Sequence, residues 1–516
     1  MPKIKKVYGS PGTGKTSYLI DSARNSYTGL YIVFNKSMQE DAKLRFPNSI
    51  EVKTLHSLCY ELLELDDKDI FTNKEIVDFM NDMGIDMENG DVDQEEGYFN
   101  STNVGGRILM SINKSRNNFQ PIEPVDGFDG DIYELYHKYR DAMGARYDFT
   151  RMIEDVAFNQ NLSAYPYNLY IDEAQDLTPL QWIVVKRLIE NTSNEVIIAG
   201  DDYQKIYTML GVMDDFYNFK ADEEIVLNKS YRMNRAVYNF SNKLSKMMIN
   251  IKPRELEVRE GGLVEYVDYE TMLSMLNQLI DTNKKVFILT RTKFNILKIG
   301  SIGGIANDLI ENGIPFLSIN PSHAGFSPWS SDEFIEKYNT AIELFTKGSA
   351  LRDRVVKLAK HFPVEDPKNI HTSLRKGIKS KITSKTNNNM LDPLITFNEF
   401  KSWFTTPVDF QDVVREAFTD RQKRVINAVG LNAPTDKSQI HIYLDTIHSV
   451  KGLEADIVFI DVAVPDRIYR MLTSPDPNDV SDEYKVWYVG ATRAKDELYF
   501  FNSGLFNSSF PIDEYL

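Results

Sequence analysis

One stretch decides the fold of this chain: Gly9-Ser10-Pro11-Gly12-Thr13-Gly14-Lys15-Thr16. It follows the short apolar segment 4–8 and precedes residues 17–23, whose pattern is typical of the first turns of a helix. Glycines let backbone N–H groups converge on anionic oxygens, and a helix N-terminus adds positive potential at the same place. A strand, a glycine-rich loop and a helix in this order predict a phosphate-binding loop.

Two side chains at the end of this loop supply chemistry that backbone amides lack. Lys15 can reach the terminal phosphates of a nucleotide, and the hydroxyl of Thr16 can ligate Mg²⁺. The other nucleotide-binding positions that we expect in the loop are Gly9, Gly12, Thr13 and Gly14.

Composition narrows the class of protein. A chain of 516 residues is too long for one core, and 42% hydrophobic with 26% charged residues is typical of soluble proteins. The sequence contains no run of 18 apolar residues, so it predicts no membrane span. Its single cysteine, Cys59, indicates a reducing, cytoplasmic location. The net charge of −16 argues against nonspecific coating of nucleic acid, although it leaves room for a local basic groove.

The segments after the loop alternate between strand and helix patterns. Residues 30–34 predict a strand, and residues 38–45 and 58–65 predict helices. This alternation favours a parallel α/β sheet, in which ligands bind at the carboxyl ends of the strands. From residue 66 to 150 the alternation stops, and helix patterns over 106–115 and 131–143 indicate a mostly helical insertion.

The α/β pattern returns with two strands that end in polar residues. The first, at 168–171, is followed by Asp172 and Glu173. Asp172 can hold Mg²⁺, and Glu173 can orient and deprotonate an attacking water. The second strand leads to Gln204, which can hydrogen-bond a γ-phosphate and so respond to its presence.

A second α/β segment follows, interrupted in its turn by an insertion. Strands are predicted at 263–267, 286–290, 440–444, 457–460 and 497–501. Residues 321–435 are rich in helix patterns, and the stretch 371–389 is basic without any acid. That stretch is either a solvated loop or a loop that contacts phosphates. Its basic residues are Arg375, Lys376, Lys379, Lys381 and Lys385.

The order of these motifs along the chain resembles that of superfamily 1 helicases, specifically the UvrD/Rep family. Besides the segments above, the resemblance rests on Phe34-Asn35-Lys36, Thr54-Leu55-His56-Ser57, residues 200–207, Ser230-Tyr231-Arg232, Leu289-Thr290-Arg291-Thr292, residues 446–454 and 488–494, and, in the first insertion, residues 112–117 and 147–149.

The resemblance implies two RecA-like parallel-sheet domains, each with a mostly helical insertion, and ATP in the cleft between them. The implied domains are 1–65 with 151–235, and 236–320 with 436–516. The implied insertions are 66–150 and 321–435.

The resemblance also implies roles for residues outside the loop. Arg232 and Arg493 are expected as arginine fingers, with Arg493 contributed by the second domain. Tyr231 is expected to stack on adenine, and Glu454 to lie near the sugar and phosphate of the nucleotide. Single-stranded DNA is expected to contact Asn35, Lys36, Thr54, His56, Tyr207, Arg291 and His448.

The expected function is an ATP-dependent DNA helicase or translocase that moves 3′→5′ and acts as a monomer on single strands and on single/double-strand junctions. A motor that strips proteins from DNA, a nucleotide-gated binding module and an RNA substrate remain alternatives, and protein partners stay unknown. The family commonly has Trp and Arg where this chain has Met209 and Leu210, so we expect a weaker or displaced base-stacking platform. Only eight residues precede Gly9, where the family usually has a glutamine that reads adenine, so we expect relaxed selectivity for ATP.

Overall fold

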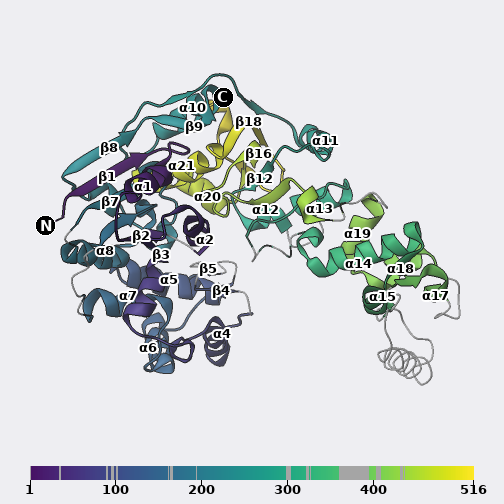
Figure 1. Ribbon diagram of the computed structural model, residues 1–516, viewed down its shortest axis with the longest axis horizontal. Helices are drawn as coiled ribbons and strands as arrows, with labels where there is room; N and C mark the ends of the chain where they lie inside the picture. Colours follow the sequence, from purple (N-terminus) through teal and green to yellow (C-terminus); the bar gives the residue numbers. More distant parts are fainter. Residues whose placement is uncertain are drawn as a thin grey trace. The chain divides into compact units, whose positions relative to one another are not determined.

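Six parallel strands form the sheet that carries the glycine-rich loop, in the order β3-β2-β6-β7-β1-β8 (Figure 1). The structure is a computed structural model that describes residues 2–33, 36–88, 91–94, 98–99, 103–160, 162, 167–192, 194–297, 304–320, 323, 325, 327–359, 394–401, 408–429, 434 and 436–516. The strands are β1 (Ile4–Gly9), β2 (Gly29–Val33), β3 (Ile50–Thr54), β6 (Asn168–Ile171), β7 (Val196–Gly200) and β8 (Glu223–Leu227).

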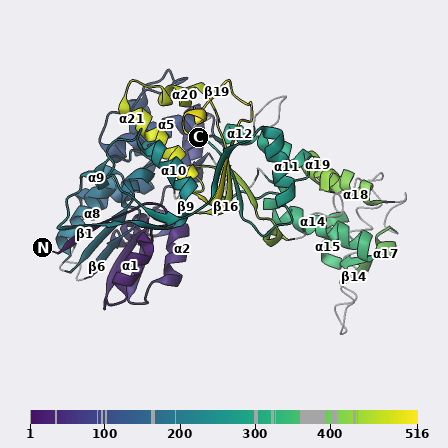
Figure 2. The same ribbon diagram turned by 90° about the horizontal axis from the view of Figure 1, so that it is seen from above.

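Helices cover both faces of this sheet. Side chains of β2 alternate between two cores: Leu30 and Ile32 pack on one face, and Tyr31 and Val33 pack on the other. The first core also contains residues of α3 (Leu55–Leu62), α7 (Phe149–Phe158) and α8 (Pro179–Asn191), and the second contains residues of α1 (Lys15–Ala23) and α2 (Lys36–Arg45). Figure 2 shows α8 on one side of the strands and α1 and α2 on the other. Burial on both faces explains why the central strands β2 and β7 are apolar along their whole length.

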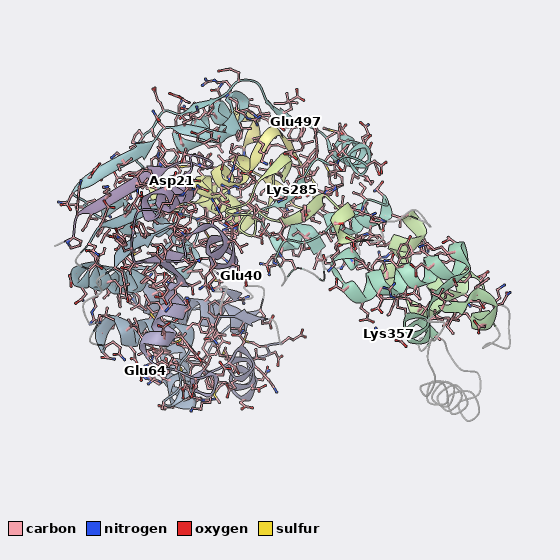
Figure 3. All side chains as sticks on the ribbon, in the orientation of Figure 1. Asp21, Glu40, Glu64, Lys285, Lys357 and Glu497 are labelled. Carbon is pink, nitrogen blue, oxygen red and sulfur yellow. The ribbon has the colours of Figure 1, made fainter. Side chains whose placement is uncertain are left out.

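The outer surfaces of α1 and α2 are polar, as expected for helices that pack on a sheet by one side. Asp21 on α1 and Glu40 on α2 are exposed, and both are labelled in Figure 3. No helix within the described ranges is long and apolar enough to cross a membrane.

The first insertion is mostly helical, as predicted. It contains α4 (Asn73–Asp82), α5 (Val104–Asn118) and α6 (Ile132–Met143), which share an apolar core. Two short strands, β4 (Val92–Asp93) and β5 (Tyr98–Phe99), pair antiparallel beside them.

One predicted helix begins earlier than expected. α3 starts at Leu55 rather than at residue 58, because the Thr54 side chain accepts from the Ser57 backbone N–H at 3.1 Å and the Ser57 hydroxyl accepts from the Thr54 N–H at 2.9 Å. This reciprocal capping box satisfies amides that would otherwise have no acceptor at the helix start.

A second sheet has five strands in the order β11-β18-β16-β12-β15. They are β11 (Leu263–Tyr266), β12 (Val286–Thr290), β15 (Ile442–Thr446), β16 (Ala455–Asp461) and β18 (Ala494–Phe501). All five predicted strands are present: β12 has the predicted ends, and each of the other four is shifted at one end or both. β12 lies between β15 and β16 and is parallel to both. An α/β fold with parallel strands is therefore confirmed.

Helices dominate the described part of the second insertion. They include α14 (Asp332–Ile342), α15 (Arg352–Ala359), α18 (Phe410–Ala417) and α19 (Asp420–Val429). Lys357 on α15, labelled in Figure 3, pairs with Glu336 on α14 at 3.0 Å. The basic stretch 371–389 lies outside the described residues.

The chain packs as two compact units whose boundaries differ from the predicted ones. The first unit consists of Met1–Val264, Asp466–Glu497 and Asp513–Leu516, and the second of Glu265–Pro465 and Leu498–Ile512. The predicted second domain includes all of 436–516, yet α20 (Asp466–Leu472) and α21 (Pro477–Ala491) belong to the first unit. The reason is packing: α21 is buried along most of its length and contacts α10 (Arg235–Ser245).

Candidate nucleotide-binding site

The glycine-rich loop is held in shape by its own hydrogen bonds. The Thr13 hydroxyl donates to the Ser10 carbonyl at 2.8 Å, and the Lys15 ammonium donates to the Gly9 carbonyl at 2.9 Å. Gly12 and Gly14 have left-handed φ angles of 70° and 84°, which residues with a Cβ atom rarely adopt. The predicted nucleotide-binding residues of the loop therefore lie together, and Lys15 can exchange a neutral carbonyl for a phosphate oxygen.

The neighbouring strand β9 (Lys229–Asn234) is hydrogen-bonded to the glycine-rich loop. The Tyr231 backbone N–H donates to the Gly12 carbonyl at 2.8 Å, and the Ser230 hydroxyl donates to the Pro11 carbonyl at 2.8 Å. These bonds bring Tyr231 and Arg232 beside the loop. Tyr231 is 71% exposed, with the Lys229 ammonium 5.4 Å from the centroid of its ring, so the other face of the ring is the one available for the predicted stacking on a base.

The two predicted metal ligands touch each other. The Thr16 hydroxyl donates to Oδ2 of Asp172 at 2.7 Å, and the Tyr31 hydroxyl donates to the same oxygen at 2.8 Å. Burial, together with the neighbouring Glu173 carboxylate, raises the pKa of Asp172 above its ordinary value. A carboxylate and a hydroxyl are hard oxygen ligands, so this pair fits Mg²⁺.

Glu173 occupies an unusual backbone position directly after β6. Its φ and ψ angles are 50° and 39°, a left-handed conformation that is uncommon for a residue other than glycine. The Gln175 amide donates to the Glu173 carboxylate at 2.6 Å and to the Asp176 carboxylate at 3.0 Å. Strained backbone of this kind clusters at functional sites, because the surrounding structure must hold it in place.

A chain of hydrogen bonds continues from Gln175 to the predicted arginine finger. The Asp201 N–H donates to the Gln175 side-chain carbonyl at 2.8 Å. The Gln204 amide then donates to the Asp201 carboxylate at 2.6 Å, and Nη2 of Arg493 donates to Oε1 of Gln204 at 2.6 Å. All of these bonds lie within the first compact unit.

Arg493 is a buried cation in an environment crowded with charges. Only 1% of the residue is exposed, and its Nε donates to the Val489 carbonyl at 2.9 Å. Burial lowers the pKa of Arg493 to about 9, and Arg232 acts in the same direction, whereas Glu173 opposes both. Three predicted catalytic side chains are thus near enough to influence one another. Arg493 belongs to the first compact unit, whereas the family resemblance implied that the second domain contributes it.

Three predicted DNA contacts are described in the first unit. Thr54 caps α3 at the carboxyl end of β3, and the ring of His56 lies 5.2 Å from the ring of Phe149. Tyr207 follows the short helix η3 (Asp202–Gln204) that carries Gln204. Lys36 begins α2, but Asn35 and the Lys36 side chain lie outside the described residues.

The other two predicted DNA contacts follow neighbouring strands of the second unit. Arg291 comes directly after β12, and His448 comes two residues after β15. The strands pair with Thr290 opposite Thr446, so the two residues leave the sheet at the same edge. Glu454 immediately precedes β16, at the amino end of that strand.

Two family models match the chain over long stretches. Residues 3–224 match the UvrD/REP helicase N-terminal domain, and residues 336–503 match the UvrD-like helicase C-terminal domain. The chain belongs to the UvrD/Rep family of superfamily 1 helicases.

Relatives of this UvrD/Rep chain are distant in sequence. It is similar to the ATP-dependent DNA helicase PcrA of Staphylococcus epidermidis, with 23% identity across 96% of this chain and 81% of the relative. The ATP-dependent DNA helicase Rep of Buchnera aphidicola is 24% identical across 64% of this chain and 61% of its own length. F-box DNA helicase protein 1 of Schizosaccharomyces pombe is 24% identical across 46% of this chain, which spans only 30% of that relative.

Four residues that hold the site together have no role predicted from the sequence: Tyr31, Gln175, Asp201 and Arg254. Asp201 stands within the motif at 200–207, and Gln175 comes two residues after Glu173, but spacing alone does not reveal their partners. Tyr31 lies in the apolar strand β2, where the sequence predicts an ordinary core residue. Only its hydroxyl, in contact with Asp172, distinguishes it from a phenylalanine at the same position.

Proposed function

We propose that this chain is an ATP-dependent DNA helicase or translocase that moves 3′→5′ along single-stranded DNA. The observation that carries the proposal is the unbroken set of contacts from the loop, through Asp172, Glu173 and Gln204, to Arg493. Membership of the UvrD/Rep family and relatives named as ATP-dependent DNA helicases support it.

Hydrolysis of ATP breaks the bond between the β- and γ-phosphates. Glu173 accepts a proton as a water oxygen attacks the γ-phosphorus, and ADP departs with the bridging oxygen. Lys15, Arg232 and Arg493 stabilise the negative charge that spreads over the transferring phosphoryl group. An arginine in such a position is worth roughly 10³–10⁵ in rate.

Thr16 and Asp172 are the residues that hold Mg²⁺ in this proposal. Bound by these residues, Mg²⁺ would neutralise part of the negative charge of the phosphates. Tyr31 contributes by orienting the carboxylate of Asp172, because its hydroxyl donates to Oδ2. Tyr231 supplies a stacking face for the adenine, and Glu454 is proposed to lie near the sugar and phosphate.

The proposed substrate is single-stranded DNA, bound by a monomer, including strands next to a duplex junction. Aromatic and imidazole rings such as those of Tyr207, His56 and His448 can stack on bases without sequence preference. Thr54 and Arg291 offer hydrogen bonds to the backbone, and we propose the same for Asn35 and Lys36.

Strand displacement on duplexes with a 3′ or a 5′ single-stranded tail tests this function. We expect ATP-dependent unwinding of the 3′-tailed substrate, and ATP turnover that single-stranded DNA stimulates. The Lys15→Ala variant, which lacks the phosphate-binding ammonium, is the matched negative control. Preference for the 5′ tail would contradict the proposed polarity.

Two further outcomes would point to the alternative functions. ATP-driven removal of streptavidin from a biotinylated strand, without unwinding, would identify a motor that displaces proteins. Turnover that DNA does not change would favour a nucleotide-gated binding module.

A further inference from the structure

We propose that Arg254 is a positioning residue for Gln204: it holds the Asp201 carboxylate that orients the Gln204 amide. This inference rests on the proposed role of Gln204 at the γ-phosphate. Arg254 lies in the segment between α10 and β10 (Glu257–Arg259), outside every motif on which the family resemblance rests.

Arg254 forms a buried ion-pair cluster with two consecutive carboxylates. Nη2 of Arg254 lies 3.3 Å from Oδ1 of Asp201, and the same nitrogen pairs with Asp202. The side chains of Arg254, Asp201 and Asp202 are 2%, 0% and 3% exposed, so water screens none of these charges well. Removing one partner from a buried group of charges leaves the others uncompensated, and the remaining carboxylates must then move or take up protons.

An aromatic contact fixes the plane of the guanidinium group. Its central carbon lies 4.5 Å from the ring centroid of Tyr203, the residue between Asp202 and Gln204. Tyr203 in turn packs edge-on against Tyr488 of α21, with 5.4 Å between ring centroids. Nε of Arg254 also donates to the Lys252 carbonyl at 3.2 Å. The guanidinium group is therefore held by its edge and by its face.

The carboxylate of Asp201 decides which way the Gln204 amide points. An ionised carboxylate only accepts hydrogen bonds, and a guanidinium only donates them. The Gln204 NH₂ group must therefore face Asp201, at 2.6 Å, and its carbonyl oxygen must face Arg493, also at 2.6 Å. If the Asp201 carboxylate rotated away, the amide could turn and this assignment of donor and acceptor would be lost.

A lysine cannot replace this arginine fully. The ammonium group of a lysine is a point charge without the flat guanidinium plane, so it stacks less well on the Tyr203 ring and has no Nε to bond the Lys252 carbonyl. Arg254→Lys therefore keeps a positive charge among the buried carboxylates while it loosens the geometry. It is the variant that separates positioning from simple charge balance.

The test is a cycle of four proteins: wild type, Arg254→Lys, Gln204→Ala and the double variant. We measure DNA-stimulated ATP turnover at saturating ATP, together with the KM for ATP. In the wild-type background we expect Arg254→Lys to lower kcat by about tenfold, since small misplacements of catalytic groups cost up to about 10²-fold, and to change KM by less than about twofold. In the Gln204→Ala background the same substitution should change kcat by less than about twofold.

The possible results distinguish a failure of the positioning role of Arg254 from a failure of the proposed role of Gln204. An equal loss from Arg254→Lys in both backgrounds would overturn the positioning role. Normal turnover in Gln204→Ala would instead refute the proposed role of Gln204 itself. A rise in KM with unchanged kcat would show that Arg254 serves nucleotide binding, which also contradicts the inference.

A second variant keeps the test informative if Arg254→Lys folds poorly. Arg254→Met combined with Asp202→Asn removes one positive and one negative charge, so the net charge of the cluster is unchanged while Asp201 loses its cation. We expect kcat to fall about tenfold or more in this protein as well. Lys252→Met is the matched control, because the Lys252 side chain pairs with Glu224 rather than with Asp201 or Asp202. It should leave kcat and KM within about twofold of wild type.

Discussion

Gln204 and Arg493 share a hydrogen bond of 2.6 Å in which the guanidinium group donates to the glutamine carbonyl. The two residues are 289 positions apart in the chain, and both are buried. The Gln204 carbonyl is thus already paired, and an approaching γ-phosphate competes with it for Arg493. Detection of the phosphate by Gln204 and charge stabilisation by Arg493 are therefore linked steps in the proposed mechanism.

Glu173→Gln should abolish most ATP turnover without loss of ATP binding. The amide cannot accept a proton from water, and a positioned general base contributes at least about 10²-fold to rate. Steady-state hydrolysis should fall by that factor or more, while the affinity for a nonhydrolysable ATP analogue stays within about threefold. Glu190→Gln, on the exposed side of α8, is the matched control. A turnover within two- to threefold of wild type, on the order of ordinary surface effects, would remove Glu173 from the role of general base.

Gly12→Ala should weaken nucleotide binding by disrupting the loop. A Cβ atom at Gly12 would lie 2.3 Å from the Cβ of Arg232, and the φ angle of 70° disfavours any side chain. The loop and β9 would have to separate, which removes the contact between Gly12 and Tyr231. We expect a loss of ATP affinity of at least about tenfold, equivalent to about 1.4 kcal/mol.

Gly84→Ala is the control for the backbone effect alone. Gly84 has a similar φ of 76°, but no atom lies within 4 Å of the added Cβ. It should cost on the order of 1 kcal/mol of stability and leave ATP affinity unchanged. Equal ATP affinity in the Gly12→Ala variant and wild type would show that the loop tolerates the separation.

Residues close to a strand end were predictable from local pattern. Lys15, Asp172 and Gln204 each follow a buried strand directly or within a few residues, so strand patterns alone bring them to one edge of a parallel sheet. The roles of Tyr31 and Arg254 were not predictable in this way. Their partners lie 141 and about 50 residues away, and neither residue type signals that partner.

The grouping of α21 with the first unit also depends on information that no local pattern contains. Strand β18 begins within the first unit and ends within the second, so the order of motifs gives no boundary between them. The contacts of α21 with α10, and of Tyr488 with Tyr203, associate this helix with the first unit.

Stability should rise between about pH 8 and pH 10.5 because of Lys485. Burial and, next, the nearby Lys205 lower its pKa from 10.5 to about 8, against the opposing effects of Asp482, Asp214 and Asp201. In this window the unfolded chain binds more protons than the folded one, so the free energy of unfolding increases with pH. Below pH 8 the buried charge costs about 3 kcal/mol, at about 1.36 kcal/mol for each pKa unit.

Lys485→Met should therefore raise the midpoint of thermal unfolding at pH 7. The advantage over wild type should shrink as the pH approaches 10.5, because wild-type Lys485 is then neutral in both states. Lys186→Met, which removes a half-exposed lysine, should show no such trend. A difference that is independent of pH would mean that Lys485 stays charged in the folded protein throughout.

Affinity for single-stranded DNA should depend only moderately on salt, although the protein carries a net charge of −16. Overall repulsion means that binding must come from a local track of few phosphate contacts together with base stacking. Each neutralised phosphate contributes about −0.7 to the slope of log affinity against log salt, so about three to five contacts give a slope of roughly −2 to −3.5. Titrations of labelled oligonucleotide at several salt concentrations measure this slope.

The basic stretch 371–389 provides the discriminating variant for this prediction. Replacing its five basic residues with Ser should flatten the slope by about 0.7 for every phosphate that the stretch contacts. If the stretch is only a solvated loop, the slope will not change, and the contacts must come from residues such as Lys36 and Arg291. A wild-type slope steeper than about −6 would require roughly eight or more neutralised phosphates. That is more than the seven predicted DNA contacts can supply, since only two of them, Lys36 and Arg291, are permanently cationic.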